Sequence, residues 1–341
     1  MVVKALNLRH KSISAGLRVL RDLGFMSRVA NSNRRNNSLL ILCYHGLSLH
    51  DEHEWAPHLY LTPEVFRSRL NCLREMGASV LPLAEALRLL RRNSLPPRSV
   101  AITFDDGFYD FLHQGLPILS EFGYPATLYL TTHYCHHRVP VIDLGLGYIL
   151  WKSKRTVMAF PEYGICEPVH TSTGQERQDL MRRIVRWTDQ NRLGTKEKDD
   201  VARQIAGKLG IDYDQIVRRR MFQILSPEEV TEVAQSGIDI QLHTHRHRTP
   251  RERKLFIREI EENRNQIRAM TGKNPVHFCY PSGMYEPEFF SWLDQCGVRT
   301  ATTCDTGLDS ALSDSMKLPR VLDINSLSPV RFESIVAGFL V

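Results

Sequence analysis

A buried-strand pattern that ends on two adjacent aspartates is the feature that most constrains this chain. Residues 100–104 are apolar or β-branched with only Thr103 polar, and Asp105, Asp106 and Gly107 follow at once. Neighbouring strand residues face opposite ways, so the two carboxylates can point in different directions. Asp-Gly is also a common hairpin signal, but residues 108–122 read as a helix rather than as a second strand. A strand, paired acids and a helix predict a site at the carboxyl edge of a parallel sheet.

A histidine-rich pentapeptide follows another strand-like run, residues 238–242. It reads His243, Thr244, His245, Arg246, His247, and imidazoles this close together at a strand exit can bind one divalent ion. Alone, the pentapeptide is a weak signal. Combined with an aspartate at another strand end, it supplies two imidazoles and one carboxylate with open positions for water.

The two motifs together resemble those of the NodB-like polysaccharide deacetylases, carbohydrate esterase family 4. The resemblance covers roughly residues 39–341. It implies an α/β fold, a distorted (β/α) barrel, that removes acetyl groups from N-acetylated sugars with a bound divalent metal, most often zinc. It further implies that Asp105 is the catalytic base and that Asp106, His243 and His247 hold the metal.

Two motifs of that family are altered in this chain. Cys279 stands where the family has an arginine that orients the base, although Tyr280, Pro281 and Ser282 keep the shape of the substrate-binding loop and a backbone donor at Ser282. Arg320 is the candidate replacement, and we group it with the substrate-site residues; a surface cation is the alternative.

The late Leu-x-His motif, which supplies the general acid, is also missing. A subgroup of the family with permuted motif order takes this proton from an early Tyr-His step, which Tyr44-His45 resembles. The alternative for His45 is a side chain that only satisfies a backbone carbonyl.

Three regions of the chain are expected around these motifs. Residues 1–38 form a basic segment with one acid, read as an amphipathic helix that packs on the barrel or lies on a membrane surface, and then a polar linker from residue 31. Residues 39–341 form the deacetylase domain, in which residues 134–225 or so are a helical insertion. The loop at residues 47–61 places Trp55 at the mouth of the site as a flat surface for a sugar ring, or simply on the molecular surface.

Composition narrows the setting of this protein. With 341 residues, 42% hydrophobic and 24% charged, the chain matches an ordinary globular protein. Its seven cysteines lack a regular spacing and fit a reducing compartment, and we find neither a secretory signal nor an apolar run of spanning length. We therefore expect a cytoplasmic protein, peripheral at the inner membrane face if the basic segment binds there. The net charge of +6 comes with no nucleic-acid-binding motif, so nucleic acid is not expected as a partner.

Three functions remain open from the sequence. The first is metal-dependent removal of acetyl groups from N-acetylated amino sugars of a polysaccharide or its oligosaccharide intermediate. The second is hydrolysis of small cyclic amides, and the third is a glycan-binding barrel that has lost its chemistry. The two altered motifs favour the third function, and the intact Asp105, Asp106, His243 and His247 oppose it.

Overall fold

The computed structural model describes residues 13–341 and contains a curled sheet of eight parallel strands. The strand order is β11-β10-β9-β6-β5-β1-β12, with β4 beside β5. These strands are β1 (Leu40–Tyr44), β4 (Ser79–Val80), β5 (Ser99–Phe104), β6 (Thr127–Leu130), β9 (Asp239–Leu242), β10 (His277–Cys279), β11 (Thr300–Thr302) and β12 (Val321–Leu322). Two further short strands, β2 (Gly46–Leu47) and β3 (Tyr60–Leu61), pair beside the sheet.

The sheet closes through the short segment that contains β12. Val321 of β12 pairs with Leu42 of β1, and Leu318, just before β12, forms a parallel bridge with Thr302 of β11. Residues 318–322 thus connect β11, at one end of the strand order, with β1 near the other end. The distorted (β/α) barrel predicted from the sequence is confirmed.

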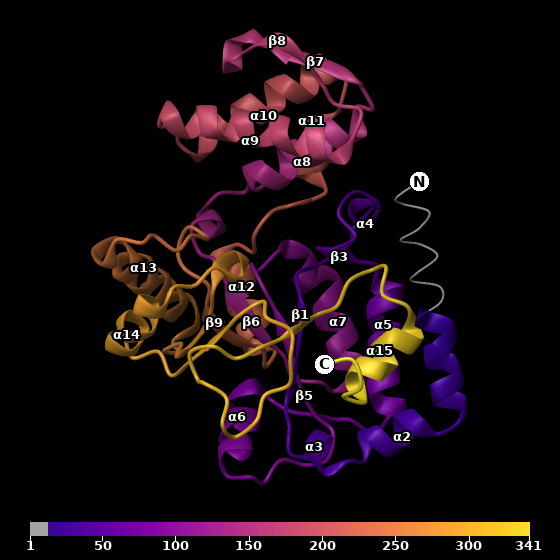
Figure 1. Ribbon diagram of the computed structural model, residues 1–341. Helices are drawn as coiled ribbons and strands as arrows, with labels where there is room; N and C mark the ends of the chain where they lie inside the picture. The colour runs from indigo at the N-terminus through magenta and orange to yellow at the C-terminus, as the bar shows by residue number, and fades with distance from the viewer. Residues whose placement is uncertain (1–12) are drawn as a thin grey trace.

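Helices surround the barrel (Figure 1). They are α5 (Pro63–Glu75), α6 (Leu83–Arg91), α7 (Leu116–Phe122), α12 (Pro227–Gln235), α13 (Arg253–Thr271), α14 (Pro287–Gln295) and α15 (Pro329–Val336). The short helix α4 (Glu52–Trp55) lies above the barrel in Figure 1, in the loop between β2 and β3. Two of these helices begin at a side-chain cap: the Thr62 hydroxyl accepts from the Val65 N–H, and the Ser226 hydroxyl accepts from the Glu229 N–H. The largest apolar cluster, between the sheet and most of these helices, forms the main core, and the buried face of α6 packs in a second cluster with Ile41 and Ala101.

The predicted insertion stands apart from the barrel, at the top of Figure 1. It contains α8 (Ile142–Lys152), β7 (Val157–Phe160), β8 (Ile165–His170), α9 (Gly174–Gln190), α10 (Thr195–Leu209) and α11 (Tyr213–Arg218). The helical insertion expected from the sequence also contains strands, because β7 and β8 form an antiparallel hairpin. In β7, buried and exposed residues alternate over only four positions, too short a run to be distinguished within a charged stretch. The insertion has its own apolar cluster, to which Ala56 and Tyr60 of the barrel loop also belong.

The basic segment packs on the barrel. Residues 13–22 are helical, and Leu17 is buried in a cluster with Val330 and Ala337. After α2 (Phe25–Ala30), the stretch from residue 31 that was expected to be a linker contains a further short helix, α3 (Asn33–Asn36), so that expectation is wrong. Arg35 of α3 is buried because its guanidinium donates to three backbone carbonyls, including those of Val336 and Ser99. Lys4, Arg9 and Lys11 lie outside the described residues.

No helix in residues 13–341 is long and apolar enough to cross a membrane.

Candidate metal and catalytic site

Three strand ends bring the predicted site residues to one edge of the barrel. Asp105 and Asp106 follow β5, His45 follows β1, and His243 follows β9. Because the strands are parallel, their carboxyl ends meet on the same face. Backbone strain gathers here: Asp106, Thr244, His247 and Ser282 all have φ between 53° and 70°, a region that side chains rarely adopt. Such conformations persist where the surrounding structure fixes them, and they are frequent at functional sites.

Gly107 is required at this strand end. Its φ is 87°, and a Cβ there would lie 2.3 Å from Cδ1 of Leu130. The glycine therefore lets the paired acids turn away from β5 directly beside β6.

The predicted ligand set is assembled around the Asp106 carboxylate. Its Oδ1 lies 3.2 Å from Nε2 of His243 and 3.2 Å from Nε2 of His247. In a tetrahedral site with bonds of about 2.0–2.1 Å, neighbouring ligand atoms are about 3.3 Å apart. These two distances match that spacing, and all three donor atoms lie within 4.8 Å of one another.

The tautomer of His243 indicates that a proton or a metal ion lies between its Nε2 and Oδ1 of Asp106. Its Nδ1 lies 2.8 Å from the carbonyl oxygen of Cys279, which can only accept, so Nδ1 carries a proton. In the neutral ring Nε2 is then an acceptor that faces a second acceptor, Oδ1 of Asp106. A proton on Nε2 or a metal ion resolves this contact. Two imidazoles and a carboxylate suit a divalent transition ion, so the residues fit a metal.

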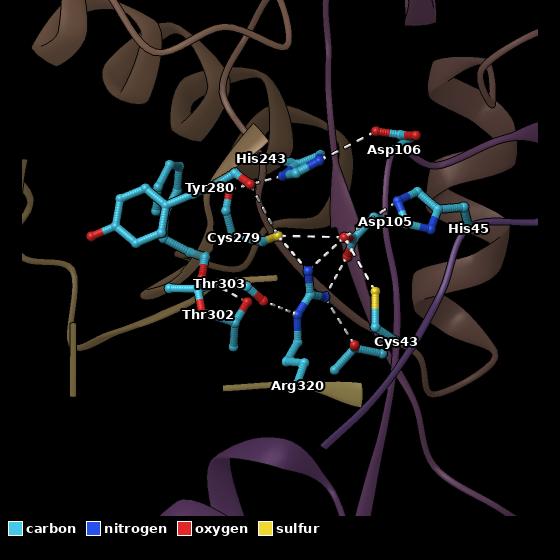
Figure 2. A network of polar contacts seen from close by, with 12 residues as sticks. Cys43, His45, Asp105, Asp106, His243, Cys279, Tyr280, Thr302, Thr303 and Arg320 are labelled. Atoms are coloured by element: carbon cyan, nitrogen blue, oxygen red, sulfur yellow. Dashed lines mark hydrogen bonds and ion pairs between the residues drawn. The ribbon is translucent and has the colours of Figure 1, made fainter. Parts of the chain in front are cut away.

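Asp105 is held by Arg320 rather than by the metal ligands (Figure 2). The guanidinium donates from Nη1 to Oδ1 and from Nη2 to Oδ2, both at 2.7 Å. Burial opposes ionisation of Asp105, but this paired contact outweighs it and holds the pKa of the carboxyl well below its usual range. The carboxylate is therefore ionised and fixed in orientation.

Two thiols complete the surroundings of Asp105. Sγ of Cys279 is 3.4 Å and Sγ of Cys43 is 3.6 Å from its Oδ2. Burial raises the pKa of both thiols well above the usual value, so they remain protonated donors. Arg320 Nη2 also lies 3.0 Å from the Cys279 sulfur. The short cysteine at the family's arginine position thus adjoins the guanidinium that arrives from the barrel-closing segment.

His45 lies on the other side of the same carboxylate. Its Nε2 is 3.9 Å from Oδ2 of Asp105, and the side chain is 17% exposed. Burial lowers the pKa of His45, against the opposing effect of the two aspartates. Its Nδ1 is buried without a hydrogen-bond partner in the part of the chain described, so the ring is not explained as a support for a backbone carbonyl.

The remaining predicted residues are divided between the site and its surroundings. Tyr280 and Ser282 line the same cavity as Asp105, Asp106, His243 and His247, whereas Pro281 is buried and does not line it. Arg320 is 1% exposed and does not line the cavity, so it is neither a surface cation nor a substrate contact. It touches Asp105 instead.

Trp55 also departs from its expected place. Its ring packs edge-on against Tyr148 and Phe222, at the base of the insertion. It faces a neighbouring pocket of about 270 Å³ rather than the main cavity. An aromatic residue in a loop gave no sign of this partner, because the contact depends on how the insertion folds.

Two residues of α13 support the site and were not predicted. Asn263 accepts from the His243 N–H and donates to the Leu130 carbonyl, and Glu259 accepts from the Arg246 backbone N–H. Both are about 1% exposed or less. The sequence did contain a signal for them: Glu259 and Asn263 are polar residues one turn apart on the helix face that also carries the apolar Phe256 and Ile260.

A cavity of about 750 Å³ joins the barrel edge to the insertion. Its floor contains His45, Asp105, Asp106, His243 and His247, and its opposite wall is one face of α9. A volume in this range is typical of ligand pockets.

Comparison with known proteins places the chain in a family. A model described as polysaccharide deacetylase matches residues 92–301, well over half of the chain. The chain belongs to the polysaccharide deacetylase family. The match includes both motifs and Tyr280-Pro281-Ser282, but neither His45 nor Arg320.

Similar individual proteins agree with this placement. The poly-beta-1,6-N-acetyl-D-glucosamine N-deacetylase of Staphylococcus epidermidis is 29% identical over 108 residues, 29% of this chain and 37% of that protein. The matched stretches span only about a third of the length of the curated relatives.

Solved structures with the same fold cover nearly the whole chain. The deacetylase PplD of Streptococcus pyogenes, solved with acetate, has a TM-score of 0.58 at 18% identity, covering 89% of this chain and 98% of that one. IcaB of Ammonifex degensii has a TM-score of 0.54 at 17% identity, covering 89% and 97%.

Proposed function

We propose that this protein is a metal-dependent hydrolase that removes acetyl groups from N-acetylated amino sugars of a polysaccharide or its oligosaccharide intermediate. The observation that carries the proposal is the spacing of Asp106, His243 and His247 beside an ionised, oriented Asp105 in one cavity. Membership of the polysaccharide deacetylase family and the N-deacetylase relative support the choice of substrate.

We propose zinc as the ion, held by Asp106, His243 and His247, because two imidazoles favour it over magnesium or calcium. When bound, such an ion polarises the acetyl carbonyl and supports ionisation of the attacking water. The Cys279 carbonyl fixes the His243 tautomer, and Asn263 fixes the backbone from which that ring projects.

Asp105 is the proposed base. It accepts a proton from the attacking water, whose oxygen forms a bond to the acetyl carbon. Arg320 keeps the carboxylate ionised and aimed while this happens. The developing negative charge on the carbonyl oxygen is proposed to receive a hydrogen bond from the Ser282 backbone at the cavity wall.

His45 is the proposed acid. The neighbouring Asp105 and Asp106 carboxylates favour the protonated form of the ring. The carbon–nitrogen bond breaks as this protonated ring gives its proton to the departing amine, which otherwise leaves as an unfavourable amide anion. The proton that Asp105 took can then return to His45 across 3.9 Å, through one intervening water. The enzyme thereby recovers its starting protonation.

The proposal is tested by metal analysis of the purified protein together with acetate release from N-acetylated glycans, with small cyclic amides as the comparison substrates. We expect about one divalent ion per chain and acetate from glycans only. Turnover of the cyclic amides alone would establish the second function, and a metal-loaded protein inert on the whole panel would establish a barrel without chemistry.

We also propose that the basic segment contacts an anionic membrane surface. Its helices expose large apolar side chains next to arginines: Val19 is 58% exposed, Leu23 72% and Phe25 42%, beside Arg18 and Arg28. Apolar and cationic groups together suit a surface of anionic lipid.

Vesicle sedimentation tests this contact. The protein should sediment with vesicles that contain phosphatidylglycerol and not with phosphatidylcholine alone. Leu23→Glu should weaken binding, whereas Leu312→Glu, at a residue 95% exposed outside this segment, should not. Equal binding of both variants contradicts the proposal.

A further inference from the structure

The cavity wall opposite the catalytic residues is formed by one face of α9. The residues on it recur at three- and four-residue spacing, which places them on one side of the helix. They are Gln178, Met181, Arg182, Val185, Arg186 and Asp189. The opposite face, with Leu180, Ile184 and Thr188, is buried in the insertion. Packing of the insertion therefore uses one face of α9, and the other is left for whatever enters the cavity.

Two arginines on this wall are not neutralised by strong ion pairs. Arg182 reaches Asp179 at 3.4 Å, but both side chains are more than half exposed, so the pair is weak. Arg186 takes part in none of the ion pairs found within residues 13–341. The two guanidinium groups are four positions apart and lie on the same side of the helix.

The acids of the cavity are largely engaged elsewhere. Asp105 pairs with Arg320, Asp106 faces the two histidines, and Asp189 lies 2.5 Å from Nζ of Lys198. Asp143 is the remaining carboxylate on the lining, and Lys198 acts on it as well. The α9 wall thus presents an excess of positive charge toward the site of deacetylation.

We propose that Arg182 and Arg186 form a subsite for an anionic group of the glycan, so that the substrate is an acidic N-acetylated polysaccharide or oligosaccharide. A guanidinium matches a carboxylate or a phosphate with two parallel hydrogen bonds, and two of them one turn apart hold one anion or two successive ones. Met181 and Val185 lie next to them on the same helix face and supply an apolar surface for a sugar ring. This inference rests on the proposed function and specifies its substrate.

The first experiment compares substrates of matched length. Deacetylation is measured on a neutral N-acetylated oligosaccharide, on one in which uronic acid residues alternate with N-acetylated sugars, and on a phosphorylated N-acetylated oligosaccharide. The wild-type protein should prefer an anionic substrate, and the preference should fall as salt is added. Whichever anion is preferred identifies the group as carboxylate or phosphate.

Charge-removing variants then locate the subsite. Arg182→Gln/Arg186→Gln should lower kcat/KM on the preferred anionic substrate by about tenfold or more, because charge-assisted hydrogen bonds are lost, and leave the neutral substrate unchanged. Arg183→Gln is the matched control, an exposed arginine of the same helix that does not line the cavity, and should change neither. An equal loss on both substrates, or no loss on either, overturns the inference.

A binding measurement separates this inference from the proposed function. A deacetylated oligouronate or inorganic phosphate is titrated into the metal-loaded protein. Binding that depends on Arg182 and Arg186 without deacetylation of any glycan supports the subsite and removes the proposed function. Deacetylation of neutral glycans with no binding of either anion supports the proposed function and overturns the anionic subsite.

Discussion

The buried pair between Arg320 and Asp105 makes a quantitative prediction. The two side chains are 1% and 3% exposed and share two hydrogen bonds of 2.7 Å. Replacing Arg320 with methionine leaves an uncompensated buried carboxylate, which typically costs about 3–5 kcal/mol. The Thr303 carbonyl and the Thr103 hydroxyl lose a donor as well, at 3.0 and 3.1 Å.

The same substitution should be far milder when the carboxylate is already gone. In an Asp105→Asn background Arg320 is itself the unpaired buried charge, so Arg320→Met removes that charge together with its hydrogen bonds and should cost about 1 kcal/mol or less. The coupling free energy between the two positions is then about 2–4 kcal/mol.

Urea unfolding of the wild type, both single variants and the double variant measures this coupling. A chelator is present throughout, so that metal affinity does not contribute to stability. Arg320→Lys should fall between wild type and Arg320→Met, because it keeps the charge and loses the planar fork. If Arg320→Met costs the same with and without Asp105, the pair is not what stabilises this part of the barrel and the reasoning fails.

Three other predictions follow from the site and the core. Asp106→Ala and His247→Ala should each lose bound metal, whereas Asp105→Asn should keep the metal and lose turnover by orders of magnitude. Metal analysis and acetate release measured on the same samples test this, and full metal retention in the first two variants refutes the ligand set. His45→Ala should keep fold and metal but lose rate mainly on sugar amides rather than on activated esters, and an equal loss on both means that another group is the acid. Burial raises the pKa of Asp309 to about 8, so the folded state holds a proton that the unfolded state releases above about pH 4, and stability falls as pH rises from about 4 to 8. Asp309→Asn should remove about 1 kcal/mol per pH unit of that slope in urea unfolding, unlike Asp294→Asn at an exposed position; an unchanged slope contradicts the assignment.

Short-range sequence patterns were enough to predict most strands and helices of the barrel. Strands such as β1 and β5 are fully buried apolar runs, and the caps at Thr62 and Ser226 mark helix starts within four residues. Each of these features is set by neighbours in the chain, so periodicity and capping chemistry predict it. The hairpin of β7 and β8 was missed because β7 has only four residues and β8 is mostly exposed. Arg35 was read as part of a linker because two of its three carbonyl partners, Val336 and Ser99, are distant in the sequence.

The residues of the site show the same difference between local patterns, which can be predicted, and long-range contacts, which cannot. Asp105, Asp106, His243 and His247 stand in motifs, and each motif is local. The contact of Arg320 with Asp105 joins positions 215 apart, and it exists because residues 318–322 close the barrel between β11 and β1. A cysteine at the usual arginine position therefore does not by itself mean lost chemistry, because Arg320 brings a guanidinium to Asp105, the proposed base, from another part of the chain. For the same reason the arginines of α9 had no local signature, since only the folded insertion turns that helix face toward the catalytic edge.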